Sequence, residues 1–153
     1  MTTITHPKDL LTMIGQDLGS SPWLDVTQER IGTFADATDD HQWIHVDVER
    51  AKTGPFGGPI AHGYLTLSLL IPLWSEILVI EELDMAVNYG LNKVRFPAPV
   101  PAGSRVQVSA TLADAEEVGG NGIQATIDAI MRVEGADKPV CIAQMVHRYY
   151  YKD

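Results

Sequence analysis

The sequence predicts an α+β fold, a single domain in which one buried helix precedes an antiparallel sheet. Apolar and polar residues alternate in the second half of the chain, and a run of Gly and Asn separates two of the alternating stretches. Strands that are joined by such short turns are antiparallel. The first half has apolar residues at helical spacing, without the strand–helix–strand alternation of a parallel sheet. A length of 153 residues fits one domain, residues 1–153, with a substantial hydrophobic core.

The first 19 residues predict a short amphipathic helix, on the spacing of Leu10, Leu11, Met13, Ile14 and Leu18. Gly15 or Gly19 is expected to end this helix, because glycine is common just beyond a helix C-terminus. The segment lacks the basic stretch and cleavage pattern of a secretory signal. A brief strand over residues 23–26 follows, and Thr27 is then placed to cap a helix over residues 28–38.

Residues 39–59 are rich in His, Gly and Pro and predict a loop with short helical turns. The most apolar run, residues 64–80, is interrupted by Pro72 and Glu76, so it does not predict a membrane span. It predicts a long central helix from about residue 62 to residue 73. Because this helix is apolar nearly all round, we expect it to be buried in the core.

The remaining chain predicts strands over residues 85–94, 106–112, 123–133 and 139–151. The Gly-Gly-Asn-Gly sequence at residues 119–122 indicates the turn between the second and third of these strands. The PAPVPAG sequence at residues 97–103 predicts a rigid connection.

Composition limits the possible partners. A net charge of −9, from 11 basic and 20 acidic residues, disfavours a broad binding surface for nucleic acid or anionic lipid. Cys141 is the single cysteine, so the chain forms no internal disulfide and no site made of several cysteines. Its place in a strand-like run predicts a buried, inert thiol. We therefore expect a cytoplasmic protein that binds neither nucleic acid nor membrane.

Residues 39–47 are unusual, because three carboxylates and two imidazoles occur within nine residues. One interpretation is a solvated loop whose polar groups cap the neighbouring turns. A second is a metal site, since His41 and His45 have the spacing of a zinc-binding H-E-x-x-H helix. Gln42, however, replaces the glutamate that acts as base there, and the sequence marks no third ligand, although His62 or His147 could fold back to supply one.

The third interpretation is acid–base catalysis by Asp40 and His45, which could together hold and activate a water molecule. A glycine-rich block, residues 57–63, follows and opens into the apolar helix. The N–H of Gly63 would lie at a helix N-terminus, where it could stabilise an oxyanion. The alternative is that Gly63 serves only a tight helix entry.

Two spaced blocks in this region resemble a known motif. They are Asp40-His41-Gln42-Trp43-Ile44-His45 and Gly58-Pro59-Ile60-Ala61-His62-Gly63. The pair is similar to the MaoC-like hydratase motif, D-x-N-P-x-H followed by P-I-x-H-G, and most closely to its NodN-like branch. The sequence from Lys93 to Gly103 continues the likeness to the family's R-F-x-x-P-V-x-x-G segment, and the resemblance covers about residues 20–150.

The resemblance implies a hotdog fold, a long helix wrapped by an antiparallel sheet and paired as a homodimer. It also implies that Asp40 and His45 are the catalytic pair and that Gly63 is the oxyanion-hole glycine. The chain departs from the family at Gln42, where many members have Asn, and at Trp43, where they have Pro. A helix serine of some members is replaced here by Ile71, so no role is assigned to it.

The activity implied is hydration of a trans-2-enoyl-CoA to an (R)-3-hydroxyacyl-CoA, and the reverse dehydration, without a metal or cofactor. The residues expected to contact the acyl-CoA are Gln42, Trp43, Phe56, His62, Tyr64 and Arg95. Arg95 is selected for the diphosphate from a set that also includes Lys93, Arg105 and Arg148. Two alternatives remain open: a hotdog acyl-CoA thioesterase, and a non-catalytic module that binds acyl-CoA or acyl carrier protein.

Overall fold

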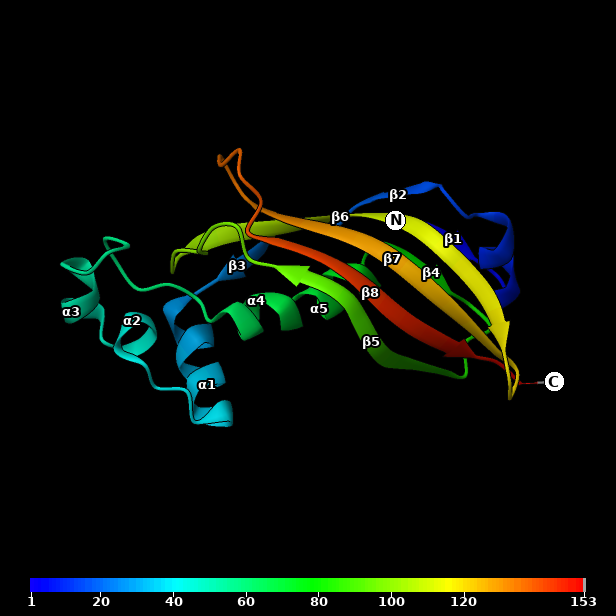
Figure 1. The fold of residues 1–153 in the computed structure, drawn as a ribbon, viewed down its shortest axis with the longest axis horizontal. Helices are drawn as coiled ribbons and strands as arrows, with labels where there is room; N and C mark the ends of the chain where they lie inside the picture. The colour runs from blue at the N-terminus through cyan, green and yellow to red at the C-terminus, as the bar shows by residue number, and fades with distance from the viewer. Residues whose placement is uncertain (153) are drawn as a thin grey trace.

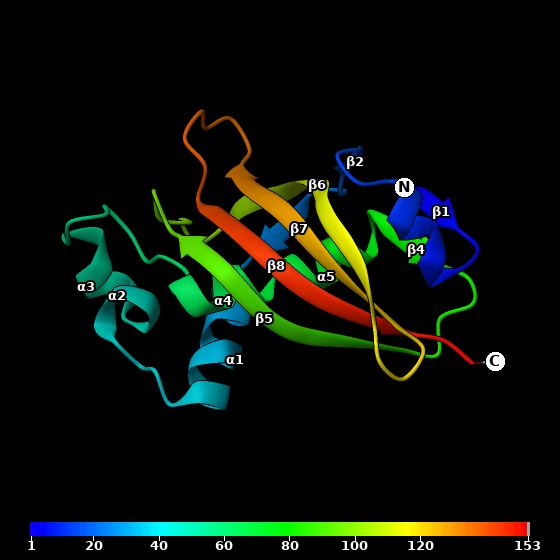
Figure 2. The same cartoon turned by 45° about the vertical axis from the view of Figure 1, so that its right-hand side comes forward.

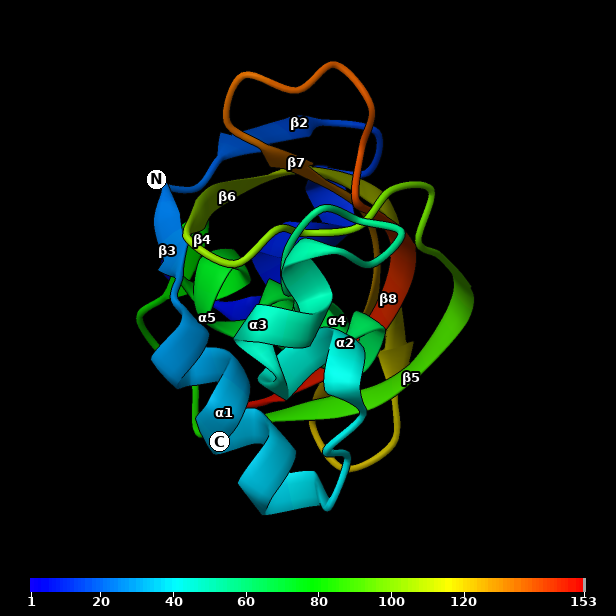
Figure 3. The same cartoon turned by 90° about the vertical axis from the view of Figure 1, so that its left-hand side faces the viewer.

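The computed structural model describes residues 1–152, in which a curved antiparallel sheet wraps around two consecutive helices (Figure 1, Figure 3). The wrapped helices are α4 (Gly63–Ser68) and α5 (Leu70–Ser75). The sheet has the order β2-β6-β7-β8-β5, and β3 also pairs with β6. Its strands are β2 (Asp17–Ser20), β3 (Leu24–Val26), β5 (Met85–Arg95), β6 (Ser104–Val118), β7 (Gly122–Val133) and β8 (Cys141–Tyr150). The α+β class and the antiparallel pairing are confirmed.

The inner face of the sheet carries the core that the period-two pattern predicted. Val106, Val108 and Leu112 of β6 are fully buried, and so are Ile123 and Ile127 of β7. Burying each such side chain contributes about 1.5–3 kcal/mol relative to its exposed state. Cys141, at the start of β8, is also fully buried, and burial raises the pKa of its thiol to about 11.

The hairpin between β6 and β7 forms at the predicted Gly-Gly-Asn-Gly turn. Gly120 and Asn121 have φ values of 77° and 55°. Two successive residues with positive φ are typical of the tight hairpin turns that match the right-handed twist of the strands. Asn tolerates this region better than other residues with a side chain.

The N-terminal helix predicted for residues 1–19 is wrong in extent. The structure has a short 3₁₀ helix, η1 (Pro7–Thr12), between β1 (Thr2–Ile4) and β2. Leu18, which was expected on the helix, lies buried in β2. Gly15 and Gly19 have φ values of 86° and 91°, so the chain leaves helical geometry at both positions.

A parallel pair of short strands was not predicted from the sequence. β1 pairs with β4 (Leu78–Ile80) outside the main sheet. β4 belongs to the apolar run that also contains the central helices, and apolar spacing in so short a segment does not distinguish a strand from a helix. The pair ties the N-terminus to the chain just beyond α5.

The central helix differs from its prediction in two ways. It is interrupted at Leu69, between α4 and α5. Pro72 explains the interruption, because proline has no N–H and its ring clashes with the carbonyl four residues earlier. The helix is also not buried all round, since Tyr64 is 73% exposed and Ser68, Pro72 and Ser75 are exposed on the same side.

Three further helices lie together at one end of the sheet, away from the two termini (Figure 1, Figure 2). They are α1 (Gln28–Thr38), α2 (Trp43–Val46) and α3 (Val48–Lys52). α1 has the predicted bounds, and the short helices α2 and α3 lie within the predicted loop of residues 39–59. Among the described residues, no helix is both long and apolar enough to cross a membrane.

Candidate active site

Asp40 is positioned by the end of α1. Thr27 begins this helix by accepting a hydrogen bond from the backbone N–H of Arg30 at 3.1 Å, as its N-cap prediction requires. Asp39 ends the helix with a φ of 58°, a left-handed conformation that turns the chain sharply. Asp40 follows this turn and is exposed.

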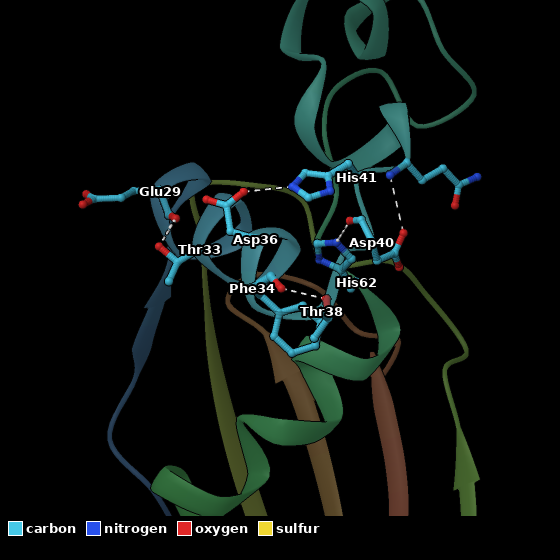
Figure 4. A network of polar contacts seen from close by, with 9 residues as sticks. Glu29, Thr33, Phe34, Asp36, Thr38, Asp40, His41 and His62 are labelled. Atoms are coloured by element: carbon cyan, nitrogen blue, oxygen red, sulfur yellow. Dashed lines mark hydrogen bonds and ion pairs between the residues drawn. The ribbon is translucent and has the colours of Figure 1, made fainter.

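His62 fixes the backbone of Asp40 from a distance of 22 residues in the sequence. Its Nε2 donates a hydrogen bond to the Asp40 carbonyl oxygen at 2.9 Å (Figure 4). The His62 side chain was predicted to contact the substrate, but the residue is only 2% exposed and also packs against Phe34. A carbonyl can only accept, so Nε2 carries the proton and Nδ1 of the neutral ring is an acceptor. Nδ1 is buried without a hydrogen-bond partner among the described residues.

His45 lies directly against His62. The two rings stack with their centroids 3.9 Å apart and an interplanar angle of 28°. Nδ1 of His45 donates to the Ile60 carbonyl at 2.7 Å, and the side chain of Gln28 donates to the His45 carbonyl at 2.7 Å. The ring is therefore held through its own nitrogen and through its backbone.

Electrostatics favour a neutral His45. Burial lowers the pKa of this imidazole, and the neighbouring His62 lowers it further. The hydrogen bond to the Ile60 carbonyl and the carboxylate of Asp40 oppose these effects, but the net direction is downward. Because Nδ1 holds its proton against the Ile60 carbonyl, Nε2 of the neutral ring has a free lone pair.

The side chains of Asp40, His45 and His62 bring one nitrogen or carboxylate oxygen each to within 4.8 Å of one another. A single water molecule that bonds to two acceptors at about 2.8 Å each can bridge such a separation. A metal ion is a poorer fit for this trio, because the ring planes of the two stacked imidazoles differ by only 28° and their centroids are 3.9 Å apart, so in-plane lone pairs do not readily meet at one point. Asp40 and His45 are therefore better suited to holding a water molecule.

The His41–His45 pair considered as a metal site does not form. His41 Nε2 lies 2.9 Å from the carboxylate of Asp36, on the exposed side of α1 (Figure 4). This hydrogen bond raises the pKa of His41. His41 thus points away from the group formed by Asp40, His45 and His62.

Gly63 begins α4 immediately after His62, so its N–H has no acceptor within the helix. A Cβ at this position would lie 3.3 Å from the ring of Phe96, which shows how closely that ring covers the glycine. Gly63, Phe56 and Phe96 line one side of a cavity of about 260 Å³. Phe56 and Gly63 therefore lie together, as predicted, while Phe96 had not been selected.

The other predicted contact residues are spread around this end of the molecule. Trp43 packs against the guanidinium of Arg50 at 4.2 Å and lies close to Gly54, so it holds α2 against α3. Gln42 is exposed at the start of α2, and Tyr64 is exposed on α4. Arg95 is exposed and donates to the Val94 carbonyl.

Gln28 and Ile60 were not predicted as part of the site. Both act through groups that no sequence motif reveals, an amide side chain and a backbone carbonyl. Of the other cations considered for diphosphate binding, Arg105 forms an ion pair with Glu134 and Arg148 stacks on Tyr89. Lys93 is exposed on β5.

The chain is similar to known proteins in both sequence and fold. The family model described as "MaoC like domain" matches residues 9–134. The 3-hydroxyacyl-thioester dehydratase Z of Mycobacterium tuberculosis (strain H37Rv) is 50% identical over 149 residues, covering 97% of this chain and 99% of that protein. Nodulation protein N of Rhizobium leguminosarum bv. viciae is 44% identical over 140 residues, covering 90% and 87%. An X-ray structure of a monoamine oxidase regulatory protein from Archaeoglobus fulgidus has a TM-score of 0.80 at 24% identity, covering 99% and 98%.

Proposed function

Because this chain belongs to the MaoC-like dehydratase family, we propose that it interconverts trans-2-enoyl-CoA and (R)-3-hydroxyacyl-CoA by adding and removing water. The name of the mycobacterial relative, a 3-hydroxyacyl-thioester dehydratase, supports this reaction class. The observation that carries the proposal is the convergence of Asp40 and His45 beside the first residue of α4. The substrates are soluble thioesters, which agrees with the cytoplasmic location expected from the sequence.

In the hydration direction, a water molecule is held between the Asp40 carboxylate and Nε2 of His45. Nε2 is the acceptor because Nδ1 is committed to the Ile60 carbonyl. As the water oxygen bonds to carbon 3 of the enoyl group, one water proton passes to this pair, and a proton from the pair is added to carbon 2. A positioned acid–base group of this kind contributes about 10²–10⁴-fold to the rate.

Carbon 3 is electrophilic because the thioester carbonyl withdraws electrons, so negative charge develops on the carbonyl oxygen during attack. We assign the backbone N–H of Gly63 as the donor to that oxygen. A donor placed where charge develops typically contributes ~3–4 kcal/mol to transition-state stabilisation. His62 is a positioning residue in this scheme, since it contacts Asp40 and His45 and not the open site.

The CoA moiety is proposed to approach past the aromatic cavity beside Gly63. Phe56 and Phe96 provide an apolar wall for the pantetheine arm. Arg95, in the segment that leads into this wall, is exposed and available to a diphosphate oxygen. Tyr64 and Gln42 are exposed and are proposed to line the bound thioester, whereas Trp43 packs on Arg50 and supports α2.

We propose that the protein is a homodimer that pairs through β5. This 11-residue strand is the last in the sheet order, so one of its edges has no partner among the described residues. All but one of its residues are exposed, including Val87, Tyr89 and Leu91 at 36%, 56% and 45%. A long apolar edge of this kind is usually covered in the functional protein.

The test is turnover of crotonyl-CoA by the purified protein, followed by loss of the enoyl absorbance, with chiral analysis of the product. Asp40→Asn keeps the size of the side chain and removes its basicity, and His45→Gln removes the proton shuttle. We expect each variant to lose at least about 10²-fold in kcat. Wild-type rates in both folded variants would overturn the assignment, and release of free CoA thiol would indicate a thioesterase instead.

A further inference from the structure

Two adjoining cavities lie along the central helices, beyond the cavity that Gly63 lines. The first, of about 220 Å³, begins at Leu67, one helical turn beyond Gly63, and the second, of about 390 Å³, reaches Leu78. Ile71, Asn88 and His147 line both of them. The cavities therefore form one channel between the exposed side of α4–α5 and the strands β5 and β8.

Most of the channel wall is apolar, but β8 places a polar group at its middle. Met145, His147 and Tyr149 alternate along the strand, so all three face the helices. Met145 lines the first cavity, Tyr149 lines the second, and His147 lies where the two meet. Although His147 faces this channel, it is only 5% exposed.

A chain of hydrogen bonds leads from Trp74 through Tyr149 to His147. Nε1 of Trp74 can only donate, and it donates to the Tyr149 hydroxyl at 2.8 Å. Nδ1 of His147 lies 3.3 Å from the same hydroxyl oxygen. Because that oxygen already accepts from Trp74, we assign its proton to the contact with Nδ1. Nδ1 is an acceptor in this arrangement, so in the neutral ring Nε2 carries the hydrogen. That Nε2–H is the ring's remaining donor.

Asn88 adds a second polar group at the same depth. It is the cross-strand partner of His147 in the β5–β8 pairing, so the two side chains lie on the same face of the sheet. Its amide can both donate and accept. Together, Asn88 and His147 form what we name the channel polar pair.

The distance from Gly63 to the channel polar pair corresponds to a certain number of carbons in an extended acyl chain. Eight residues separate Gly63 from Ile71, which is about 12 Å along a helix. An extended hydrocarbon chain advances about 1.3 Å per carbon, given C–C bonds of about 1.5 Å at tetrahedral angles. A chain whose thioester carbonyl contacts Gly63, and which then follows the exposed side of α4 and α5, reaches the polar pair at about carbon 10.

Building on the proposed hydratase activity, we propose that the channel selects medium-chain acyl thioesters that carry a hydroxyl or keto oxygen near carbon 10. The oxygen accepts the Nε2–H of His147 and bonds to the amide of Asn88. A saturated chain of the same length fills the channel but leaves the buried N–H unpaired. A site built to bond a polar atom discriminates against the analogue that lacks it.

The test compares 10-hydroxy-trans-2-decenoyl-CoA with trans-2-undecenoyl-CoA, in which a methyl group replaces the hydroxyl. We expect the wild-type protein to prefer the hydroxylated substrate at least about ten-fold in kcat/KM. His147→Phe keeps a ring in the wall but removes the donor, so this preference should disappear or reverse. Gln144→Ala, on the outer face of the same strand, should retain the wild-type ratio.

A binding measurement keeps the two proposals distinguishable. Turnover of crotonyl-CoA without discrimination between the two longer substrates would overturn the polar pair and leave the hydratase proposal intact. Absence of all turnover would overturn the hydratase proposal. Calorimetric titration with 10-hydroxydecanoyl-CoA and undecanoyl-CoA would then decide whether the channel still prefers the oxygenated chain, and equal affinities would refute that preference.

Discussion

The stacked pair of His45 and His62 is the most informative contact at the scale of single residues. His62 has two separable features, a ring that supports His45 and an Nε2–H that holds the Asp40 carbonyl. His62→Phe keeps the ring and loses the donor, whereas His62→Gln keeps a donor at a similar reach. If the donor is what matters, the Phe variant should lose about ten-fold or more in kcat, and the Gln variant should recover much of that loss. Equal kcat values for the Phe variant and the wild type would show that the Asp40 contact is dispensable.

Two buried histidines give the protein a predictable response to acid. Burial lowers the pKa of both His45 and His147 below the ordinary value of 6.5. Near and below that value the unfolded chain binds more protons than the folded chain, so the free energy of unfolding falls as the pH falls. Urea unfolding between about pH 7.5 and about pH 5.5 should show this loss. His147→Phe should flatten the slope, and an unchanged slope would contradict the assignment.

Some of the residues that meet at the site were selected from the sequence, but their partners were not. The Asp40–His45 spacing predicted that the two side chains act together, and the structure brings them within 4.8 Å; their catalytic role stays a prediction. The contact between His62 and the Asp40 carbonyl joins residues far apart in the chain and uses a backbone atom. His41 was misplaced for a different reason. Its helix-like spacing from His45 suggested that the two imidazoles share a site, but His41 instead hydrogen-bonds to the carboxylate of Asp36.

At the scale of elements, α2 and α3 form a small support for His45 that depends on one glycine. A Cβ at Gly54 would lie 2.9 Å from the Trp43 ring and 3.2 Å from the Ala51 carbonyl, whereas a Cβ at Gly58 would meet nothing within 4 Å. Gly54→Ala should lower the free energy of unfolding by about 1–3 kcal/mol, because the close packing must shift. Gly58→Ala is the matched control and should leave it unchanged or slightly raised. Equal stabilities in chemical denaturation would contradict this account.

The strands were easier to predict than the helices, for a physical reason. A sustained alternating pattern has one interpretation, so β7 and β8 were located to within two residues. β6 was found but predicted too short, because it continues to Val118 beyond the predicted end at residue 112. The apolar residues at Leu10 and Leu18 fit a helical spacing equally well, but Gly15 and Gly19 separate them into a 3₁₀ helix and a strand. Pro72 was recognised as an interruption of the apolar run, yet the run was still assigned to one helix, and the break falls three residues earlier.

At the scale of the whole molecule, the net charge of −9 excludes a broad basic surface but says nothing against a local anion contact. The cations near the proposed CoA path are few, since Arg105 and Arg148 are engaged elsewhere. The channel, by contrast, could not have been predicted. Its wall combines α4–α5, β5 and β8, and its polar pair depends on the register that sets Asn88 opposite His147.

The edge of β5 that has no partner among the described residues is available for a second copy of the chain. Val87 and Tyr89 lie on the outer face of this strand, where Arg148 stacks on the Tyr89 ring at 3.5 Å. Two β5 strands related by a two-fold axis would join the two sheets and satisfy the backbone groups that the edge leaves unpaired. A stable interface of this kind covers about 800 Å² on each partner, so helices beside the strand would also take part.

Val87→Lys tests this arrangement, because it places a charge in the proposed interface without altering the channel wall. We expect the wild type to sediment as a dimer and the Lys variant to shift toward the monomer at the same concentration. Ala136→Lys, an exposed position in the loop between β7 and β8, controls for the same +1 change in net charge. A wild-type monomer with full activity would refute the proposed dimer. A variant that remains dimeric would show that the two copies meet through another surface.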